Sequence, residues 1–453
     1  MRAAILLGAV LIGVLVWPAP AFAAGGGGLD PEVLEILAVI AVAYLVTHLL
    51  LERLAERFGF VTGVEYIILG IILGPVLGWV DADTTDALTP VIVLGVGSLG
   101  LLIGLGIDRR KMDSFNRRAV VVSAIISVCT YAVMLAVPSA AFYYFGSAEL
   151  LESSLPLLMV VAAVAMVADN GPIRALANLL DADGEAVDFA VAVARGCAAF
   201  GIIGFGLIFC FFNDTALPEG LEVASGYTWL VWLAIELALG GVLGLVFSSF
   251  LRRDFADEKI ITIIIGMVIF TSGAAFYLDL SPLFVNFIMG IVLINTAPHA
   301  DHVHARLKAI HRPLYIVLFF FGGIMWSLEA PLWGIALVVA YIPLRRLGRL
   351  VGSVAASRAV DRNGSAPGSG LSRPLLAPGA LSVAMLLKFS QVYADYPGLE
   401  HVDMLYNGLL TAIVVTEIFS YPLTRSWLID EADVAPPETR QETEESTAAG
   451  EVS

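Results

Sequence analysis

Long apolar runs fill most of this chain, and short polar or glycine- and proline-bearing segments separate them. A helix needs about 20 apolar residues to cross the hydrocarbon core of a bilayer. The pattern therefore predicts an all-α polytopic membrane protein with about 13 transmembrane helices. The predicted spans are 32–51, 62–80, 89–107, 118–145, 155–180, 187–212, 227–250, 259–278, 282–296, 313–328, 331–355, 375–394 and 403–427.

The placement of basic residues predicts the orientation of these spans. If the mature N-terminus lies outside, none of the 25 Lys and Arg residues falls in an external loop. Cytoplasmic loops normally carry the excess of Lys and Arg, so we expect the C-terminus in the cytoplasm and the protein in the cytoplasmic (inner) membrane. The predicted external loops are 81–88, 146–154, 213–226, 279–281, 329–330 and 395–402.

The two ends of the chain differ from the apolar body. Residues 1–24 have a basic start, an apolar stretch and a small-x-small motif, which together predict a signal peptide; the alternative is a retained extra helix. Residues 29–428 form the predicted transmembrane domain. Residues 429–453 are acidic, lack apolar periodicity and predict a disordered cytoplasmic tail.

Composition narrows the class of function. The chain is 58% apolar and 15% charged, with a mean hydropathy of +0.87. Much of its net charge of -16 belongs to loops and the tail, and no basic patch with interleaved aromatics suggests nucleic-acid binding. The sequence has no phosphate-binding glycine loop, nucleophile elbow or pair of catalytic acids, and its three cysteines lack metal-ligand spacing. We therefore expect no enzyme activity, no cofactor and no metal site.

The fifth predicted span, 155–180, is interrupted in its middle. Gly171 and Pro172 break the helical hydrogen-bond ladder, and Asp169 puts a carboxylate near mid-depth, at a cost of roughly 2.5–3.5 kcal/mol. Unwound backbone at that depth is tolerated where protein buries it or where it lines a cavity, and transporters use such breaks to hold ions. The alternative is a proline kink whose Asp pairs with a neighbouring Arg.

Four further segments resemble the monovalent cation:proton antiporter superfamily. Residues 60–75 end in Gly-Ile-Ile-Leu-Gly-Pro, and residues 99–108 end in Gly-Leu-Gly-Ile-Asp. Residues 281–296 begin with Ser-Pro, and residues 318–323 read Leu-Phe-Phe-Phe-Gly-Gly. Together, in family order, they extend the resemblance over residues 32–427.

The resemblance implies inverted repeats with two crossing broken helices, in a homodimer whose core bundle moves against a scaffold. The first broken helix is span 155–180. The second is span 375–394, with the break at Pro378 to Ser382, where Gly379 and Ser382 are the expected break residues. The implied function is exchange of protons for a monovalent cation (Na⁺ or K⁺) by alternating access.

One position departs from the family pattern. The family carries ion-binding carboxylates on the helix after the first broken one, and that place falls on Arg195-Gly196 here. A guanidinium cannot release its proton in this setting and cannot ligate a cation. The family's basic residue before the second broken helix matches Arg345, for which the alternative is a side chain that snorkels to the interface.

Other acidic residues must then provide the carboxylates of the ion-binding site. Asp169 is the first candidate, with Asn170 adding oxygen ligands, and Glu65 is the second. Glu236 and Glu417 also lie within spans, where they can simply face polar groups of neighbouring helices. Lys388 adds an intramembrane cation that the family pattern does not require.

Three functions remain open on these residues. The first is a proton/cation exchanger in which Asp169 titrates and Arg195 tunes it. The second is a non-transporting scaffold or sensor, in which Arg195 pairs rigidly with Asp169 or Glu65. The third is a transporter of altered selectivity, for an anion or organic substrate. His299, His302, His304 and His311 are spaced so that they could bind a metal or sense pH, but a solvated amphipathic loop is the favoured interpretation.

Overall fold

The computed structural model describes most of the predicted membrane domain. The described residues are 63–78, 88–111, 113–146, 148–213, 227–251, 257–298, 300–327, 332–360, 369–393, 402–431 and 433–434. The predicted signal peptide, the first predicted span and residues 435–453 lie outside these ranges. The same holds for His299.

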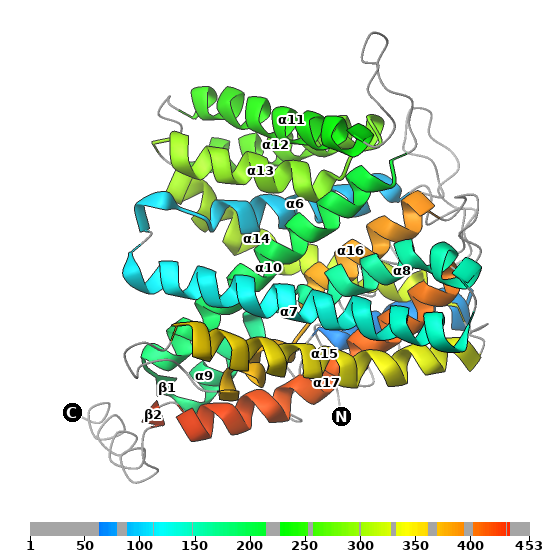
Figure 1. The fold of residues 1–453 in the computed structure, drawn as a ribbon. Helices are drawn as coiled ribbons and strands as arrows, with labels where there is room; N and C mark the ends of the chain where they lie inside the picture. Colours follow the sequence, from blue (N-terminus) through cyan, green and yellow to red (C-terminus); the bar gives the residue numbers. More distant parts are fainter. Residues whose placement is uncertain are drawn as a thin grey trace, which may run out of the picture. The chain divides into compact units, whose positions relative to one another are not determined.

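The described chain is almost entirely helical (Figure 1). Its α-helices are α4 (Val64–Ile71), α6 (Thr89–Leu105), α7 (Ser114–Phe145), α8 (Ala148–Met166), α9 (Gly171–Leu180), α10 (Glu185–Phe211), α11 (Thr228–Phe250), α12 (Asp257–Tyr277), α13 (Pro282–Thr296), α14 (Ala300–Ile324), α15 (Leu332–Val360), α16 (Gly379–Tyr393) and α17 (Val402–Glu431). A π-helical turn, η3 (Ile72–Val76), extends α4, and short 3₁₀ turns form η4 (Arg109–Lys111), η6 (Ser369–Ser372) and η7 (Pro374–Leu376).

The helices match the predicted spans in position. Five of the described helices are long and apolar enough to cross a membrane by themselves, or up to seven if each bent pair counts as one span. Shorter apolar helices occupy Val64–Val76, Thr89–Leu105, Thr262–Tyr277 and Pro282–Thr296. The chain is thus an all-helical, multi-pass membrane protein. The full count of 13 remains a prediction, because its first member lies outside the described residues.

The helices pack most densely within two groups. The first contains α4, α6, α11, α12, α13 and α14, and the second contains α7, α8, α15 and α17; α10 and α16 contact members of both (Figure 1). Glycine allows close pairing between α6 and α13, since a Cβ on Gly104 would lie 2.2 Å from the Phe287 carbonyl oxygen. Small residues at helix contacts are the usual way for membrane helices to associate without a hydrophobic driving force.

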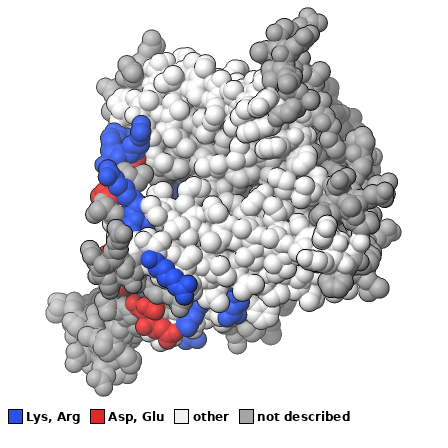
Figure 2. Space-filling model, viewed as in Figure 1, with Lys and Arg blue, Asp and Glu red and all other residues white. Residues whose placement is uncertain are grey.

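The outer face of these groups is apolar. The most apolar stretch of α11 has 22% of its residues buried, and side chains such as Val242 and Leu245 are more than half exposed. A surface of this kind is stable against lipid and would aggregate in water. On the face shown in Figure 2, the Lys and Arg side chains of the described residues gather along one edge.

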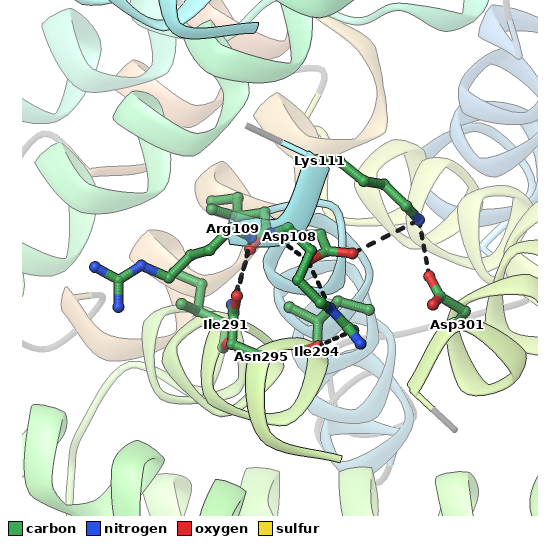
Figure 3. Close-up of polar contacts among 9 residues, drawn as sticks. Asp108, Arg109, Lys111, Ile291, Ile294, Asn295 and Asp301 are labelled. Atoms are coloured by element: carbon green, nitrogen blue, oxygen red, sulfur yellow. Dashed lines mark hydrogen bonds and ion pairs between the residues drawn. The ribbon is translucent and has the colours of Figure 1, made fainter. Parts of the chain in front are cut away.

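Part of that edge is a polar junction at the end of α6 (Figure 3). Asp108, 7% exposed, accepts a hydrogen bond from Arg110 Nε at 3.2 Å, and Lys111 Nζ contacts Asp301 of α14 at 2.8 Å. Asn295 of α13 accepts from the Arg109 amide at 2.9 Å. The Lys111 ammonium lowers the pKa of the Asp301 carboxyl below its usual value. Asp108 therefore positions Arg110 and Lys111, which in turn bind the ends of α13 and α14, and this is a structural role.

The chain beyond α17 turns back onto the membrane domain. Strand β2 (Asp433–Val434) pairs antiparallel with β1 (Ala182–Asp183), which links α9 to α10. Arg373 Nη1 contacts Asp430 Oδ2 at 2.6 Å. The expected tail boundary at residue 429 is therefore too early, since backbone pairing includes the chain as far as Val434 in the fold.

Candidate functional site: the meeting point of two broken helices

The first break separates α8 from α9. Helical hydrogen bonding stops at Met166 and resumes at Gly171, with Pro172 in the first turn, where its missing N–H costs nothing. Asp169 Oδ1 accepts a hydrogen bond from the Gly171 amide at 3.0 Å and so begins α9. The two halves still form one candidate span, Ser154–Leu180. Asn170 lies at the N-cap position, and its side chain forms no capping bond.

The second break separates η7 from α16 at Ala377 and Pro378. The segments on its two sides are bent by 55°. Gly379 adopts φ +66°, which glycine reaches at little cost, and Ser382 Oγ donates to the Pro378 carbonyl at 2.9 Å. The break begins within one residue of the position that the sequence predicted.

The two breaks touch each other. The Asp169 amide donates to the Ala377 carbonyl at 2.8 Å, which joins residues far apart in sequence through their unwound backbone. A Cβ placed on Gly379 would lie 2.5 Å from both Cβ and Oδ2 of Asp169. Glycine is therefore required here for close approach as well as for its backbone conformation.

A second carboxylate completes this contact. Glu417 of α17 is 2% exposed, and its Oε2 accepts a hydrogen bond from the Gly379 amide at 3.1 Å. Asp169 and Glu417 thus each bind the first amide of a half-helix, where the helix dipole favours negative charge. Glu417 also lies within electrostatic range of Asp169, of Glu65 on α4 and of Arg345 on α15.

Two guanidinium groups lie at the C-terminal end of α8, the helix that precedes the first break. Arg345 and Arg349 are fully buried, and both donate to carbonyl oxygens at the end of α8. Arg345 Nη2 contacts the Val167 carbonyl at 2.7 Å, and Arg349 Nη2 contacts those of Met166 and Val167 at 2.7 and 2.6 Å. Cations stabilise the C-terminal end of a helix dipole. Arg345 is buried beside the break, which disagrees with the alternative that its side chain snorkels to the interface.

Arg195 does not lie at this crossing. Its side chain lines a cavity, where Arg174 and Asp188 interact with it electrostatically. The residues of α10 that face the break are Cys197, near Arg345, and Gly201, where a Cβ would lie 2.7 Å from Val167. The alternative in which Arg195 pairs with Asp169 or Glu65 is therefore not observed among the interactions of Arg195. Both acids of α10 lie in its first turn, away from the break.

Lys388 also lies away from the crossing. It is 2% exposed, with Nζ 5.1 Å from the centre of the Phe276 ring, and it interacts electrostatically with Asp279 and Glu236. Glu236 of α11 is 1% exposed and accepts from the Ser281 amide at 2.8 Å. Lys388 and Glu236 form no ion pair among the described residues, but their attraction at longer range links α16 with the first helix group.

Two members of the crossing were not among the site residues predicted from the sequence: Glu417, for which only a contact with a polar group of a neighbouring helix was suggested, and Arg349. A signal for Glu417 was present, since a carboxylate within an apolar span is a functional candidate by default. Among the described residues, no group of three His, Cys, Asp or Glu side chains could hold a metal ion. His302 and His304 lie near the start of α14, far in sequence from both breaks.

The same arrangement of helices occurs in a solved antiporter structure. The chain is similar to the solved structure of the sodium proton antiporter MjNhaP1 from Methanocaldococcus jannaschii at pH 8, with a TM-score of 0.66, 12% identity, and coverage of 88% of this chain and 99% of that one. An electron-microscopy structure of the same antiporter gives a TM-score of 0.59 at 13% identity, covering 86% and 96%. At this identity the likeness concerns the fold. No family model and no curated protein matches the sequence.

Proposed function

We propose that this protein is a secondary transporter that exchanges protons for a monovalent cation by alternating access. The observation that carries the proposal is the contact between the two helix breaks, where Asp169 and Glu417 meet at Gly379. In this proposal the two carboxylates take the place of the acid that the family carries on the helix after the first break, because α10 has acids only in its first turn. A proton and a cation compete for the same carboxylate oxygens, so that one leaves as the other binds.

The charges around the crossing support this assignment. The carboxylates bind amides at the starts of α9 and α16, while two buried guanidiniums hold the end of α8. In this proposal the arginines bind backbone carbonyls at the end of α8, while the carboxylates lie at the starts of α9 and α16, where a cation can bind them. Glu65, half-buried on α4, extends the acidic side of the site toward the first helix group.

The distribution of basic residues supports an orientation. In the proposed topology, the edge that carries Lys and Arg in Figure 2 faces the cytoplasm, as the positive-inside rule requires. Figure 1, drawn from the same side, shows the start of α7 at this edge.

Proton flux in everted membrane vesicles tests the proposal. Addition of Na⁺ or K⁺ should collapse a preformed pH gradient with the wild-type protein, and both Asp169→Asn and Glu417→Gln should abolish the response. Asp403→Asn is the matched control, since Asp403 is an exposed acid on the same helix as Glu417. Absence of a cation response in the wild type would sink the proposal, as would two substituted proteins that respond normally.

A further inference from the structure

A cavity of about 550 Å³ opens between the start of α7, helix α9 and the first half of α10. Figure 1 shows α9 and β1 beside the start of α7 at the same edge of the protein. The cavity has the size of an ordinary small-ligand site. Arg174, which lines it, is one helical turn from Gly171, so the cavity neighbours the first break without belonging to it.

Two guanidinium groups line this cavity, Arg174 from α9 and Arg195 from α10. Within the described part of the chain, neither forms a side-chain hydrogen bond or an ion pair. Lys308 of α14 lies within electrostatic range of both. Three cationic side chains from three helices thus approach one another; Arg195 and Lys308 are exposed and Arg174 is half-buried, so an oxyanion in the open cavity can reach them.

The acids of the cavity form no ion pairs with its two arginines, although Asp188 attracts Arg195 at longer range. Glu185 and Asp188 also line the cavity, but both belong to the first turn of α10, where the helix dipole stabilises them. Neither comes within ion-pair distance of Arg174 or Arg195 in the described chain. The guanidinium N–H groups are therefore left to face the cavity.

We infer that this cavity binds an oxyanion of the phosphate class between Arg174 and Arg195. The planar guanidinium matches phosphate oxygens with two parallel hydrogen bonds, and two such groups on adjacent helices can hold one anion. The anion can be free phosphate or the headgroup of an anionic lipid, since basic pockets between membrane helices bind such headgroups. The site is separate from the proposed ion site at Asp169.

The test uses the purified full-length protein. In detergent after removal of lipid, inorganic phosphate at constant ionic strength is titrated while binding is followed by calorimetry. In a parallel arm, the protein is reconstituted with phosphatidylglycerol, re-extracted, and its retained lipid is measured by native mass spectrometry. Phosphate binding in the first arm identifies a soluble anion, whereas retention in the second arm alone identifies a lipid headgroup.

Substitutions assign the binding to the cavity. Arg195→Gln and Arg174→Gln should each weaken binding about tenfold or more, because each removes charge-assisted hydrogen bonds. Arg195→Lys keeps the charge but loses the paired geometry, and an intermediate loss is expected. Arg358→Gln, an exposed basic residue at the end of α15, is the matched control and should bind like the wild type.

Two results would overturn the inference: neither phosphate nor phosphatidylglycerol binds the wild type, or the substituted cavity binds as well as the wild type. Thermal melting of each variant establishes that it is folded, and Arg195→Lys covers the case in which a glutamine variant fails to fold. Asp169→Asn should bind phosphate normally. A failure of proton exchange therefore leaves this test unaffected, and the reverse also holds.

Discussion

The contact between Gly379 and Asp169 makes the crossing of the two breaks unusually sensitive to one added methyl group. Gly379 has φ +66°, where an L-residue pays about 1–2 kcal/mol. The new Cβ of Gly379→Ala would also lie 2.5 Å from the Asp169 side chain, well inside van der Waals contact. Overpacking of this kind costs about 1–3 kcal/mol.

The two effects together predict a loss of about 2–5 kcal/mol in the free energy of unfolding. Relief by motion is limited, because the Asp169 amide is bonded to Ala377 and the Gly379 amide to Glu417. Any shift that removes the clash therefore weakens one of these bonds. Proton exchange should fall together with stability, since the displaced groups are the proposed ion ligands.

Thermal melting in one detergent and proton flux in vesicles measure both consequences. Gly273→Ala is the control, since nothing lies within 4 Å of a Cβ at this position inside α12. Removal of a helix-interior glycine should leave stability unchanged or raise it by about 0.5–1 kcal/mol. If Gly379→Ala melts with the wild type while Gly273→Ala behaves as expected, the close contact and its proposed importance are refuted.

Three other substitutions probe other parts of the structure. Arg349→Met should lower the free energy of unfolding by about 1–3 kcal/mol, because it leaves a buried carbonyl at the end of α8 without a donor; a melting temperature equal to that of the wild type would contradict this. Lys388→Met should destabilise the protein in detergent melts by leaving Glu236 without its buried cation, and Lys388→Met with Glu236→Gln should recover part of the loss; strict additivity of the two single effects would disprove the coupling. Arg373→Ala removes an exposed ion pair and should change stability by less than about 1 kcal/mol in the same assay, so a larger loss would show that the pair does more than its exposure suggests.

The helices and both breaks could be predicted from the sequence because their signals are local. Apolar runs of membrane length, Gly171-Pro172 and Pro378-Gly379 act on their own backbone, whatever surrounds them. The face of a helix on which a side chain lies is harder to predict from the sequence. Each residue turns the helix by about 100°, so an error of two residues exchanges opposite faces. Arg195 and Cys197 differ by that amount, and only Cys197 faces the break.

Contacts between residues far apart in the sequence were the other feature of the site that the sequence could not predict. Glu417 lies in the last helix, and nothing in its local sequence distinguishes it from Glu236, which is equally buried in an apolar span. Only the fold brings one of these acids to Gly379 and the other to the Ser281 amide. The same applies to Arg345 and Arg349, whose acceptors belong to the backbone of α8 rather than to any side chain with a recognisable pattern.

The first break has a consequence for how such a site can change over time. Because α8 and α9 remain one span across residues 167–170, the gap in hydrogen bonding does not require the bundle to be built around a sharp bend. Helices α8 and α9 determine how the span packs, and residues 167–170 between them determine which polar groups it presents. Substitutions at 169 and 170 can therefore change the polar groups at the break, which are the proposed ion ligands, while the apolar contacts of the span stay the same. In a chain whose next helix carries no acid beyond its first turn, this short segment is a place where a carboxylate can be gained without rebuilding the surrounding protein.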